Sequence, residues 1–575
     1  MSARGVTSAA PGPAWESSIP PAAYLADFPL PIPVLEARWT SEVLPDGARS
    51  VTLPNRVSVR LSGAASDLGF EEPEEFQTTM LWKHSLAALQ LMLTSGDVQG
   101  ARSILDGYAD FIESERWAEL SERMTSLDHC VASRIRTICA LRAIFATLEA
   151  PLPDSAIAIL ETDLAWASEP SRYASNNHGI MLGIATMHAA EVFPRITPEA
   201  VAAVGTARFD EILAAAFDET GVCVENTPEY QGFYLTLCTN TKKFLEMSST
   251  DNSRVVAHLS ELRERAAAAL SRMLLPNGAY PALGDSGSLV EGPVPSVDGT
   301  TYSPATGIYI SKAEGVFFSF KCGYTSYVHK HMDDTSVTLQ VDGEDLILDA
   351  GLHNYDWHDP ITRAVKSQRG HSGFFFPEFD HLYPSTMYRP EEYRVRSRLR
   401  RLSDGRGSVL LSGRSVIDDT HCVARLLEHG SGTLEIVDRY WVAAAVDEFA
   451  DPVQRFLVPT ALVEERPRPG LLRFVGAGAW LEIEFDPDRA VTITTGGEGE
   501  LPLGWVSRAW SRAVPCRSVE IGVSARGAAS RATLRYGRRT EQDDAVFDRL
   551  RVEEVSGSAL ERPGNDSANR TNGAM

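Results

Sequence analysis

The sequence predicts an α+β multidomain protein, in which an N-terminal region of paired helices precedes a C-terminal antiparallel β-sandwich. Three observations support this: the length of 575 residues, a helical spacing of apolar residues over about 76–275, and strand-like segments from 300 almost to 540. Domains typically hold about 100–200 residues, so a chain of this length is too long for one hydrophobic core. We therefore expect two or three domains.

Residues 1–75 are expected to form a tail and a short cap. The first 25 or so are rich in Ser, Ala, Pro and Gly, a composition that buries too little apolar surface to offset the entropy of ordering. Residues 30–70 have a mixed, strand-like pattern. The N-terminus lacks the continuous apolar stretch of a secretory signal. We expect a cytoplasmic protein, or a periplasmic or secreted one if a signal has been removed.

Residues 76–290 are expected to form the helical domain. Apolar residues recur at helical spacing in eight segments joined by short breaks: 76–96, 98–114, 127–149, 153–168, 178–191, 198–218, 229–247 and 254–274. Many consecutive antiparallel helices with short loops form a helical bundle or a closed toroid of hairpins. The Gly- and Pro-rich segment 275–299 then indicates a domain junction.

Residues 300–545 are expected to form the β-sandwich. Segments such as GVFFSFKCG and GTLEIVDRYWV alternate or run apolar between turn signals. In TSVTLQVDGEDLILDAG, the pair Asp342-Gly343 separates two apolar strands, which predicts a hairpin. Residues 546–575 are polar again and are expected to be a disordered tail.

The composition excludes several classes of protein. A formal net charge of −23 offers no basic surface for nucleic acid, and an anionic substrate would need locally placed cations or amides. No apolar run approaches the roughly 20 residues that span a bilayer, so we expect no membrane association. The cysteines are scattered and form no CxxC pair, which indicates neither a disulfide framework nor a thiolate zinc site: Cys130, Cys139, Cys223, Cys238, Cys322, Cys422 and Cys516.

Two polar clusters occur at predicted helix starts. Asn176-Asn177-His178 fits a helix cap, or an amide and an imidazole that together bind a substrate carboxylate. The segment ENTPEYQ places Tyr230 in the first turn of the predicted helix 229–247. Tyr230 could be a packed surface aromatic or a catalytic group.

A third cluster, HKHMDD, occurs in the predicted β-domain. Alternation along an extended segment would send His329 and His331 to one face and Lys330 to the other. Two histidines and two carboxylates within six residues suit a metal site or acid/base chemistry, although a solvated polar loop has the same composition. The hairpin at 342–343 would bring Asp349 back toward His331, where His371 could join them, and two histidines with one carboxylate are common zinc ligands.

These motifs, taken in order, resemble the heparinase II/III superfamily of polysaccharide lyases. The resemblance rests on NNHG, the PEY tyrosine, the segment PNGAYPALGDSG, HKHMDD and LILDAG, and it covers about residues 76–400. It implies an (α/α) toroid followed by an antiparallel β-sandwich. It also implies β-elimination on a uronate-containing poly- or oligosaccharide, which leaves a 4,5-unsaturated uronate.

The resemblance implies a role for each matching residue. Asn177 and His178 would hold the uronate carboxylate, Tyr230 would protonate the leaving oxygen, and His329 would act as the base, although a tyrosine that performs both steps stays open. A structural Zn²⁺ would be bound by a further set: His331, Asp349 and His371. Apart from the resemblance, a cleft expected between the two domains would offer four substrate contacts, each of which could equally have an ordinary surface or packing role: His84, Asn176, Lys330 and Tyr355. Relatives often have Ala-His-Asn-Thr where this chain has Gly370-His371-Ser372-Gly373.

Two other functions fit parts of the sequence. A glycoside hydrolase on an (α/α) toroid would use two carboxylates, such as Glu225 and Glu229. A non-catalytic glycan-binding protein could retain the same fold. The sequence leaves open the identity of the glycan, whether cutting is endo or exo, and whether the protein forms a homodimer.

Overall fold

The computed structural model describes residues 40–540, except for 46–48, 54–57, 62–76, 95, 125, 249–251, 384–393, 406 and 524–528. The predicted tails at both ends lie outside these residues. The chain divides into two compact units: unit 1 comprises Met1–Phe217 and Tyr234–Glu264, and unit 2 comprises Asp218–Phe233 and Arg265–Met575. Each unit is described by itself.

Unit 1 is mainly helical and begins with a small antiparallel sheet of the order β1-β2-β3, in the region where the cap was predicted. Its strands are β1 (Thr40–Val43), β2 (Arg49–Thr52) and β3 (Ser58–Leu61). The helices are α2 (Gln77–His84), α3 (Ala88–Thr94), α4 (Val98–Ile112), α5 (Glu115–Glu122), α6 (Leu127–Thr147), α7 (Asp154–Trp166), α8 (Asn177–Val192) and α9 (Glu199–Ala215). Helices α10 (Pro228–Met247) and α11 (Ser253–Met273) contain residues of both units.

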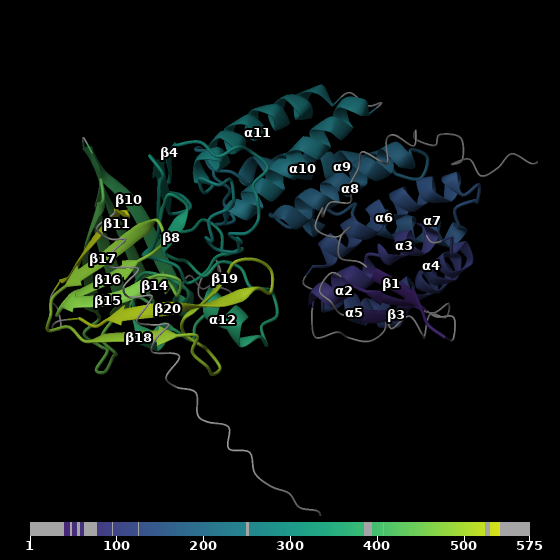
Figure 1. Cartoon of the computed structure of the whole chain (residues 1–575). Helices are drawn as coiled ribbons and strands as arrows, with labels where there is room; N and C mark the ends of the chain where they lie inside the picture. The colour runs from purple at the N-terminus through teal and green to yellow at the C-terminus, as the bar shows by residue number, and fades with distance from the viewer. Residues whose placement is uncertain are drawn as a thin grey trace, which may run out of the picture. The chain divides into compact units, whose positions relative to one another are not determined.

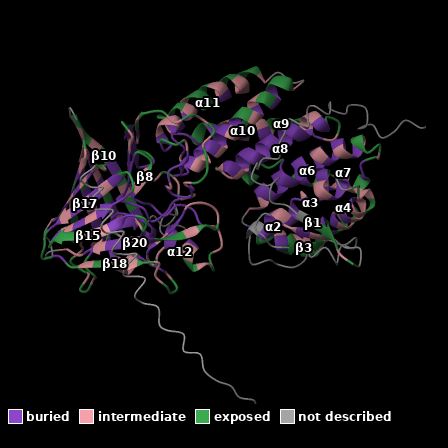
Figure 2. Ribbon diagram, in the orientation of Figure 1, coloured by how far each residue is buried: buried purple, intermediate pink, exposed green. Residues whose placement is uncertain are grey.

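Helices α6 and α8 form the core of unit 1, because they are buried on nearly all sides. Figure 2 shows both as mostly buried ribbon. Helix α9 packs closely on α8 because Gly183 and Gly205 allow it: a Cβ on Gly183 would lie 2.8 Å from the carbonyl oxygen of Gly205. The buried residues of α8 are mostly apolar, as expected for a central helix. Helix α6 also buries charged side chains, such as Arg134, which pairs with Asp163.

Over residues 76–275, the predicted helices agree with the structure except at two places. The segment 76–96 forms two helices, because Leu86 adopts a left-handed φ of 58° between them. Helix α5 was not predicted; Ser114 caps its start by accepting a hydrogen bond from the backbone N–H of Trp117.

Unit 2 contains three antiparallel sheets, which appear as the stacked arrows of Figure 1. The eight-stranded sheet has the order β10-β11-β12-β13-β21-β17-β16-β15, from β10 (Val395–Gly405), β11 (Ser408–Ile417), β12 (His421–Gly430), β13 (Thr433–Val442), β21 (Ser530–Arg538), β17 (Ala479–Phe485), β16 (Leu471–Val475) and β15 (Val463–Arg468). A second sheet has the order β18-β20-β14-β9, with β19 also paired to β20, from β18 (Val491–Thr495), β20 (Ala513–Ile521), β14 (Val453–Pro459), β9 (Phe374–Phe375) and β19 (Trp505–Ser507). The third has the order β4-β5-β6-β7-β8, from β4 (Gly299–Ser303), β5 (Ile308–Ala313), β6 (Val316–Lys321), β7 (Ser336–Val341) and β8 (Glu344–Ile347).

One apolar core joins the three sheets. Buried side chains of β6 and β7, such as Phe318 and Leu339, belong to the same cluster as Leu411 of β11 and Phe456 of β14. The predicted hairpin between β7 and β8 is confirmed: Asp342 and Gly343 have φ values of 47° and 85°, as both central residues of a type I′ turn require. This hairpin carries the chain from the loop that contains His331 to the loop that contains Asp349.

The predicted fold class, an (α/α) toroid of helical hairpins followed by an antiparallel β-sandwich, is confirmed. The junction was placed near residue 290, where helices give way to strands, whereas the compact units divide within α10 and α11. All seven cysteines are free and buried. In the described part of the chain, no helix has both the length and the apolar character needed to cross a membrane.

Candidate active site

Tyr230 lies in the first turn of α10, in a part of the helix that belongs to unit 2. Pro228 begins the helix, and the hydroxyl of Ser286 accepts a hydrogen bond from the backbone N–H of Glu229 at 3.0 Å. The Tyr230 ring stacks on the His329 ring, with centroids 3.5 Å apart and planes inclined by 25°. Its hydroxyl lies 3.2 Å from that of Tyr355. Three residues predicted from separate motifs therefore meet in unit 2.

The loop between β6 and β7 holds His329 in a left-handed conformation, with a φ of 55°. The prediction of an extended segment is wrong here, because such a φ interrupts strand alternation. The side-chain amide of Asn226 holds this loop: its Nδ2 donates to the carbonyl oxygens of Ser326, at 2.7 Å, and Val328, at 2.9 Å. A non-glycine residue in this conformation costs about 1–3 kcal/mol, so these bonds offset a local strain.

Gly284 allows the segment before Asp285 to approach this loop. A Cβ at Gly284 would lie 3.0 Å from the carbonyl oxygen of His329 and 3.1 Å from that of Asn226, and the φ of Gly284 is 55°. Any larger residue would meet both a steric and a conformational penalty.

Asp285 joins both histidines of the HKH motif. Its Oδ2 lies 2.8 Å from Nδ1 of His329, and its Oδ1 lies 2.8 Å from Nε2 of His331 and also accepts from Nζ of Lys366. Burial alone would raise the pKa of Asp285, but Lys366 and the two histidines outweigh burial and hold this pKa well below its ordinary value. The carboxylate is therefore ionised, and each histidine must donate to it.

The two tyrosines are held in their protonated form. Burial raises the pKa of Tyr230, and the negative charges of Asp285 and Glu225 raise it further. Burial also raises the pKa of Tyr355, and the negative charge of the nearby Asp285 raises it further. Lys366 lies over the Tyr355 ring, with Nζ 5.1 Å from its centroid. A buried tyrosine beside carboxylates is a proton donor rather than a base.

Two glutamates flank the catalytic candidates. Oε2 of Glu225 lies 3.6 Å from Nε2 of His329. The carboxylate of Glu229 accepts a hydrogen bond from the backbone N–H of Gly287 at 2.8 Å, and burial raises the pKa of Glu229 to about 7. Glu225 thus faces the imidazole, while Glu229 is bonded to the backbone.

The three predicted metal ligands converge in unit 2. The rings of His331 and His371 have centroids 5.4 Å apart, and Nδ1 of His371 lies 2.9 Å and 3.0 Å from the two oxygens of Asp349. Asp349 also accepts from the Ser336 hydroxyl at 2.8 Å. Nδ1 of His331 and Nε2 of His371 are buried without a hydrogen-bond partner.

These two nitrogens are the type of donor that zinc binds, and Asp349 orients His371 as carboxylates behind metal-bound histidines do. Within the described residues, however, no three His, Cys, Asp or Glu side chains are grouped so as to hold an ion. The arrangement provides two ligands and no third, so no step of the chemistry is derived through a metal. The structural zinc stays a prediction.

Asn176, Asn177 and His178 belong to unit 1. Asn176 caps helix α8, since its side chain accepts from the backbone N–H of His178 at 2.9 Å. The His178 side chain is partly exposed, and its Nδ1 lies 3.3 Å from Oδ1 of Asp128. Asn177 is buried in the first turn of the helix. Asp128 thus faces one ring nitrogen of His178, Nδ1, and the side chain is partly exposed.

Two predicted substrate contacts are buried. Nδ1 of His84 lies 3.2 Å from the Tyr108 hydroxyl inside unit 1, and none of His84 is exposed. Lys330 forms ion pairs with Asp333 and Asp334 inside unit 2. A lysine so enclosed is better explained by charge compensation than by contact with a glycan.

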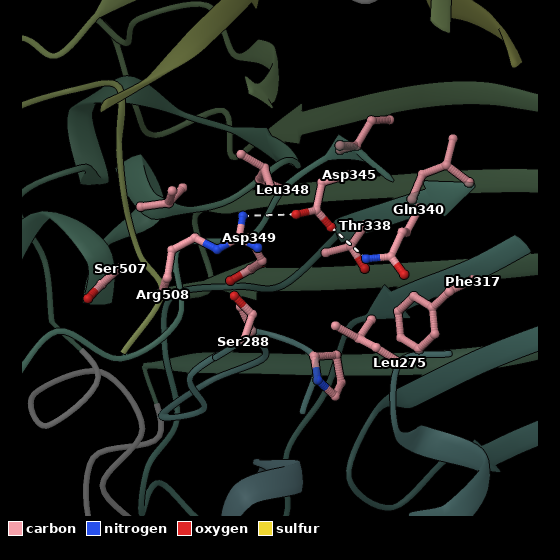
Figure 3. Close-up of a pocket in the computed structure, with 15 residues that line it drawn as sticks. Leu275, Ser288, Phe317, Thr338, Gln340, Asp345, Leu348, Asp349, Ser507 and Arg508 are labelled. Carbon is pink, nitrogen blue, oxygen red and sulfur yellow. Dashed lines mark hydrogen bonds and ion pairs between the residues drawn. The ribbon is translucent and has the colours of Figure 1, made fainter. Parts of the chain in front are cut away.

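A small pocket in unit 2 is lined by Asp349, Ser507 and Arg508 together with several apolar residues (Figure 3). Asp345 also lines this pocket, and its carboxylate accepts hydrogen bonds from Arg508 at 2.9 Å and from Gln340 at 2.9 Å. The pocket has a volume of about 30 Å³, which suits a water molecule rather than a sugar.

The sequence analysis missed Asp285 and Asn226. Both stand in quoted motifs, GDSG and ENTPEY, but the first was interpreted as a linker and the second as the approach to a helix. The signal for Asp285 was a carboxylate between two glycines at a helix-to-strand junction. Nothing in the spacing indicated that it would bind two histidines more than forty residues later.

Comparison with known proteins gives a family and a fold. Residues 299–421 match the family described as Heparinase II/III-like, C-terminal. A mutant of a heparan sulfate lyase from Pedobacter heparinus is 14% identical, with a TM-score of 0.56 over 82% of this chain and 80% of that one. A heparinase III structure is 12% identical, with a TM-score of 0.61 over 80% of this chain and 76% of that one. At such identities the likeness shows the fold alone. No curated protein sequence matches the chain.

Proposed function

We propose that the chain is a polysaccharide lyase that cleaves a uronate-containing glycan by β-elimination, because residues 299–421 match the Heparinase II/III-like, C-terminal family. The observation that carries the proposal is the stacking of Tyr230 on His329, with the Tyr355 hydroxyl within reach of both. A proton donor and a proton acceptor are thereby held side by side, as removal of a C5 proton and departure of O4 require.

His329 is proposed as the base. Since its Nδ1 donates to Asp285, its Nε2 carries the lone pair that can accept the C5 proton. The carboxylates of Asp285 and Glu225 then lie on either side of the imidazolium and stabilise its charge. General base catalysis of this kind contributes about 10²- to 10⁴-fold to the rate.

Tyr230 is proposed as the acid that protonates O4. Its raised pKa keeps the proton on the hydroxyl until the leaving oxygen develops charge, which favours the acid over the base role. Tyr355 lies 3.2 Å from the Tyr230 hydroxyl and 3.5 Å from Nδ1 of His329, so its hydroxyl is placed to hydrogen-bond Tyr230 while Tyr230 gives its proton to O4.

Asn177 and His178 are proposed to neutralise the uronate carboxylate. The C5 proton is weakly acidic because its removal adds charge to a group that is already negative. Hydrogen bonds to that carboxylate stabilise the enolate-like intermediate, as in an oxyanion hole, where one lost donor costs about 10²- to 10³-fold. Asp128, whose Oδ1 lies 3.3 Å from Nδ1 of His178, orients the imidazole.

Ultraviolet absorbance of the unsaturated product tests the proposal. We expect it to rise when the protein is incubated with one of a panel of uronate glycans and oligosaccharides, and Tyr230→Phe to abolish the rise. Tyr302→Phe, which alters a half-buried tyrosine of β4, serves as the matched control and should retain activity.

New reducing ends without an ultraviolet rise would contradict elimination and favour the hydrolase, in which case Glu225→Gln and Glu229→Gln should each abolish the reaction. Binding without any cleavage would favour the non-catalytic glycan-binding protein.

A further inference from the structure

The loop that carries Tyr355 also exposes a tryptophan. Trp357 follows Tyr355 by two residues, and 43% of it is exposed. Its ring packs edge-to-face on Tyr383, with centroids 5.4 Å apart and planes at 70°. Single exposed apolar residues are common, so exposure alone would mean little.

Hydrogen bonds hold the loop around Trp357 in its conformation. His353 and Asn354 both bind the same oxygen of Asp359, at 3.1 Å and 3.0 Å, and the backbone N–H of Asp356 donates to the Asn354 side chain at 2.8 Å. Asp359 in turn caps helix α12 (Pro360–Lys366). Trp357 is therefore held in place by its loop, and a ligand that binds a preorganised side chain loses little entropy.

Exposed aromatic rings concentrate near the catalytic candidates. Among the described residues, three aromatic side chains are exposed: Tyr327, Trp357 and Trp441. Tyr327 precedes His329 by two residues and Trp357 follows Tyr355 by two, whereas Trp441 lies on strand β13. Two of the three thus adjoin the residues proposed to perform the chemistry.

A second tryptophan packs against the same loop. Trp510, between β19 and β20, contacts the Tyr355 ring edge-to-face, with centroids 5.4 Å apart. Its hairpin is tied to the loop because the backbone N–H of Ser511 donates to the carbonyl oxygen of His353 at 2.7 Å. Both β19 and Trp510 lie outside the residues that the family match covers.

We propose that Trp357 is the stacking platform of a sugar-binding subsite beside the Tyr230–His329 pair, for a pyranose ring next to the two sugars whose bond is cleaved. The C–H face of a pyranose is apolar and packs on an aromatic ring without any charge. Such affinity suits a protein of net charge −23, which repels a polyanion at long range. This inference rests on the proposed function in one respect: the proposed function identifies the bond that is cleaved, and so locates the subsite along the glycan.

The test measures binding by calorimetry in the Tyr230→Phe background, which leaves ligands uncleaved. The probes are di- and tetrasaccharides of heparosan, chondroitin and alginate. We expect Trp357→Ala to weaken binding of the best tetrasaccharide about tenfold, at low and at moderate salt alike, because stacking is not screened. Disaccharide binding should change less than about twofold, and Trp357→Phe should retain most of the affinity.

Trp441→Ala is the matched control, since it also removes an exposed tryptophan from unit 2 and should leave binding unchanged. A melting temperature for each variant shows that it is folded. The subsite is refuted if Trp357→Ala binds the tetrasaccharide like its parent, if it weakens both lengths equally, or if no tetrasaccharide binds the parent.

Failure of the proposed function looks different. Wild-type protein would then produce no unsaturated uronate, while the length-dependent loss in Trp357→Ala would still support the platform.

Discussion

His329 and His331 are two residues apart and bind the two oxygens of the same carboxylate, yet their surroundings differ. The His329 side chain is 13% exposed, stacks on a tyrosine and has a strained backbone. That of His331 is fully buried beside His371. A group that meets substrate must be reachable, so the contrast supports the proposal that His329 takes part in the chemistry while His331 has a structural role.

Asp285→Asn should have the largest effect, because it disturbs both histidines at once. The isosteric amide leaves the buried Lys366 without its counter-charge, and loss of one partner from such a pair costs about 3–5 kcal/mol. We expect that loss in the free energy of unfolding, measured with urea, together with loss of lyase activity.

The control is Asp345→Asn, which removes a partly exposed ion pair with Arg508 and should cost less than about 1 kcal/mol. If Asp285→Asn lost activity but kept its free energy of unfolding, Asp285 would act only through its contact with His329.

Substituting His329 and His331 one at a time separates the roles of the two histidines. His329→Asn keeps a residue that tolerates left-handed φ, so stability should hold while kcat/KM falls about 10²- to 10⁴-fold. His331→Asn should instead lower the free energy of unfolding by about 1–3 kcal/mol, because a buried bond to Asp285 is lost. Steady-state kinetics and urea unfolding on both variants measure this. Equal effects in the two variants would remove the distinction.

Metal analysis tests the surroundings of His331. If the two orphaned nitrogens bind zinc, elemental analysis should find about one equivalent per chain, and His371→Ala should lose it. Chelation should then lower the melting temperature by several degrees, since a ligand of the folded state stabilises it. If the purified protein contained no metal and its melting temperature did not change with chelators, the zinc prediction would be contradicted.

The sequence predicted the fold and part of the site, for physical reasons. Helical and strand periodicities repeat along the chain, so the two kinds of region and the hairpin at Asp342-Gly343 could be found. Motif order indicated Tyr230 and His329, and Tyr355 was expected as a substrate contact; the three meet in unit 2. The backbone of His329 could not be predicted, because its φ depends on the distant amide of Asn226.

Burial was also beyond the sequence. Lys330 stands in a polar segment that reads as exposed, but Asp333 and Asp334 compensate its charge inside unit 2. His84 likewise bonds to Tyr108, a partner on another helix. Such pairings depend on tertiary contacts that local patterns do not record. The cytoplasmic location stays a prediction, and whether the protein forms a homodimer stays open.

Glu229→Gln should change stability only as a function of pH. Burial raises the pKa of Glu229 to about 7 from 4.5, so the folded protein holds a proton there that the unfolded chain releases. The stability that this proton contributes is fully present below pH 4.5 and is lost as pH rises through 7. The amide cannot titrate and can still accept from Gly287. We therefore expect the melting temperature of the variant, relative to wild type, to increase from pH 5 to pH 8. Glu219→Gln, at an exposed position, should show no such trend, and a trend common to both variants would contradict the assignment.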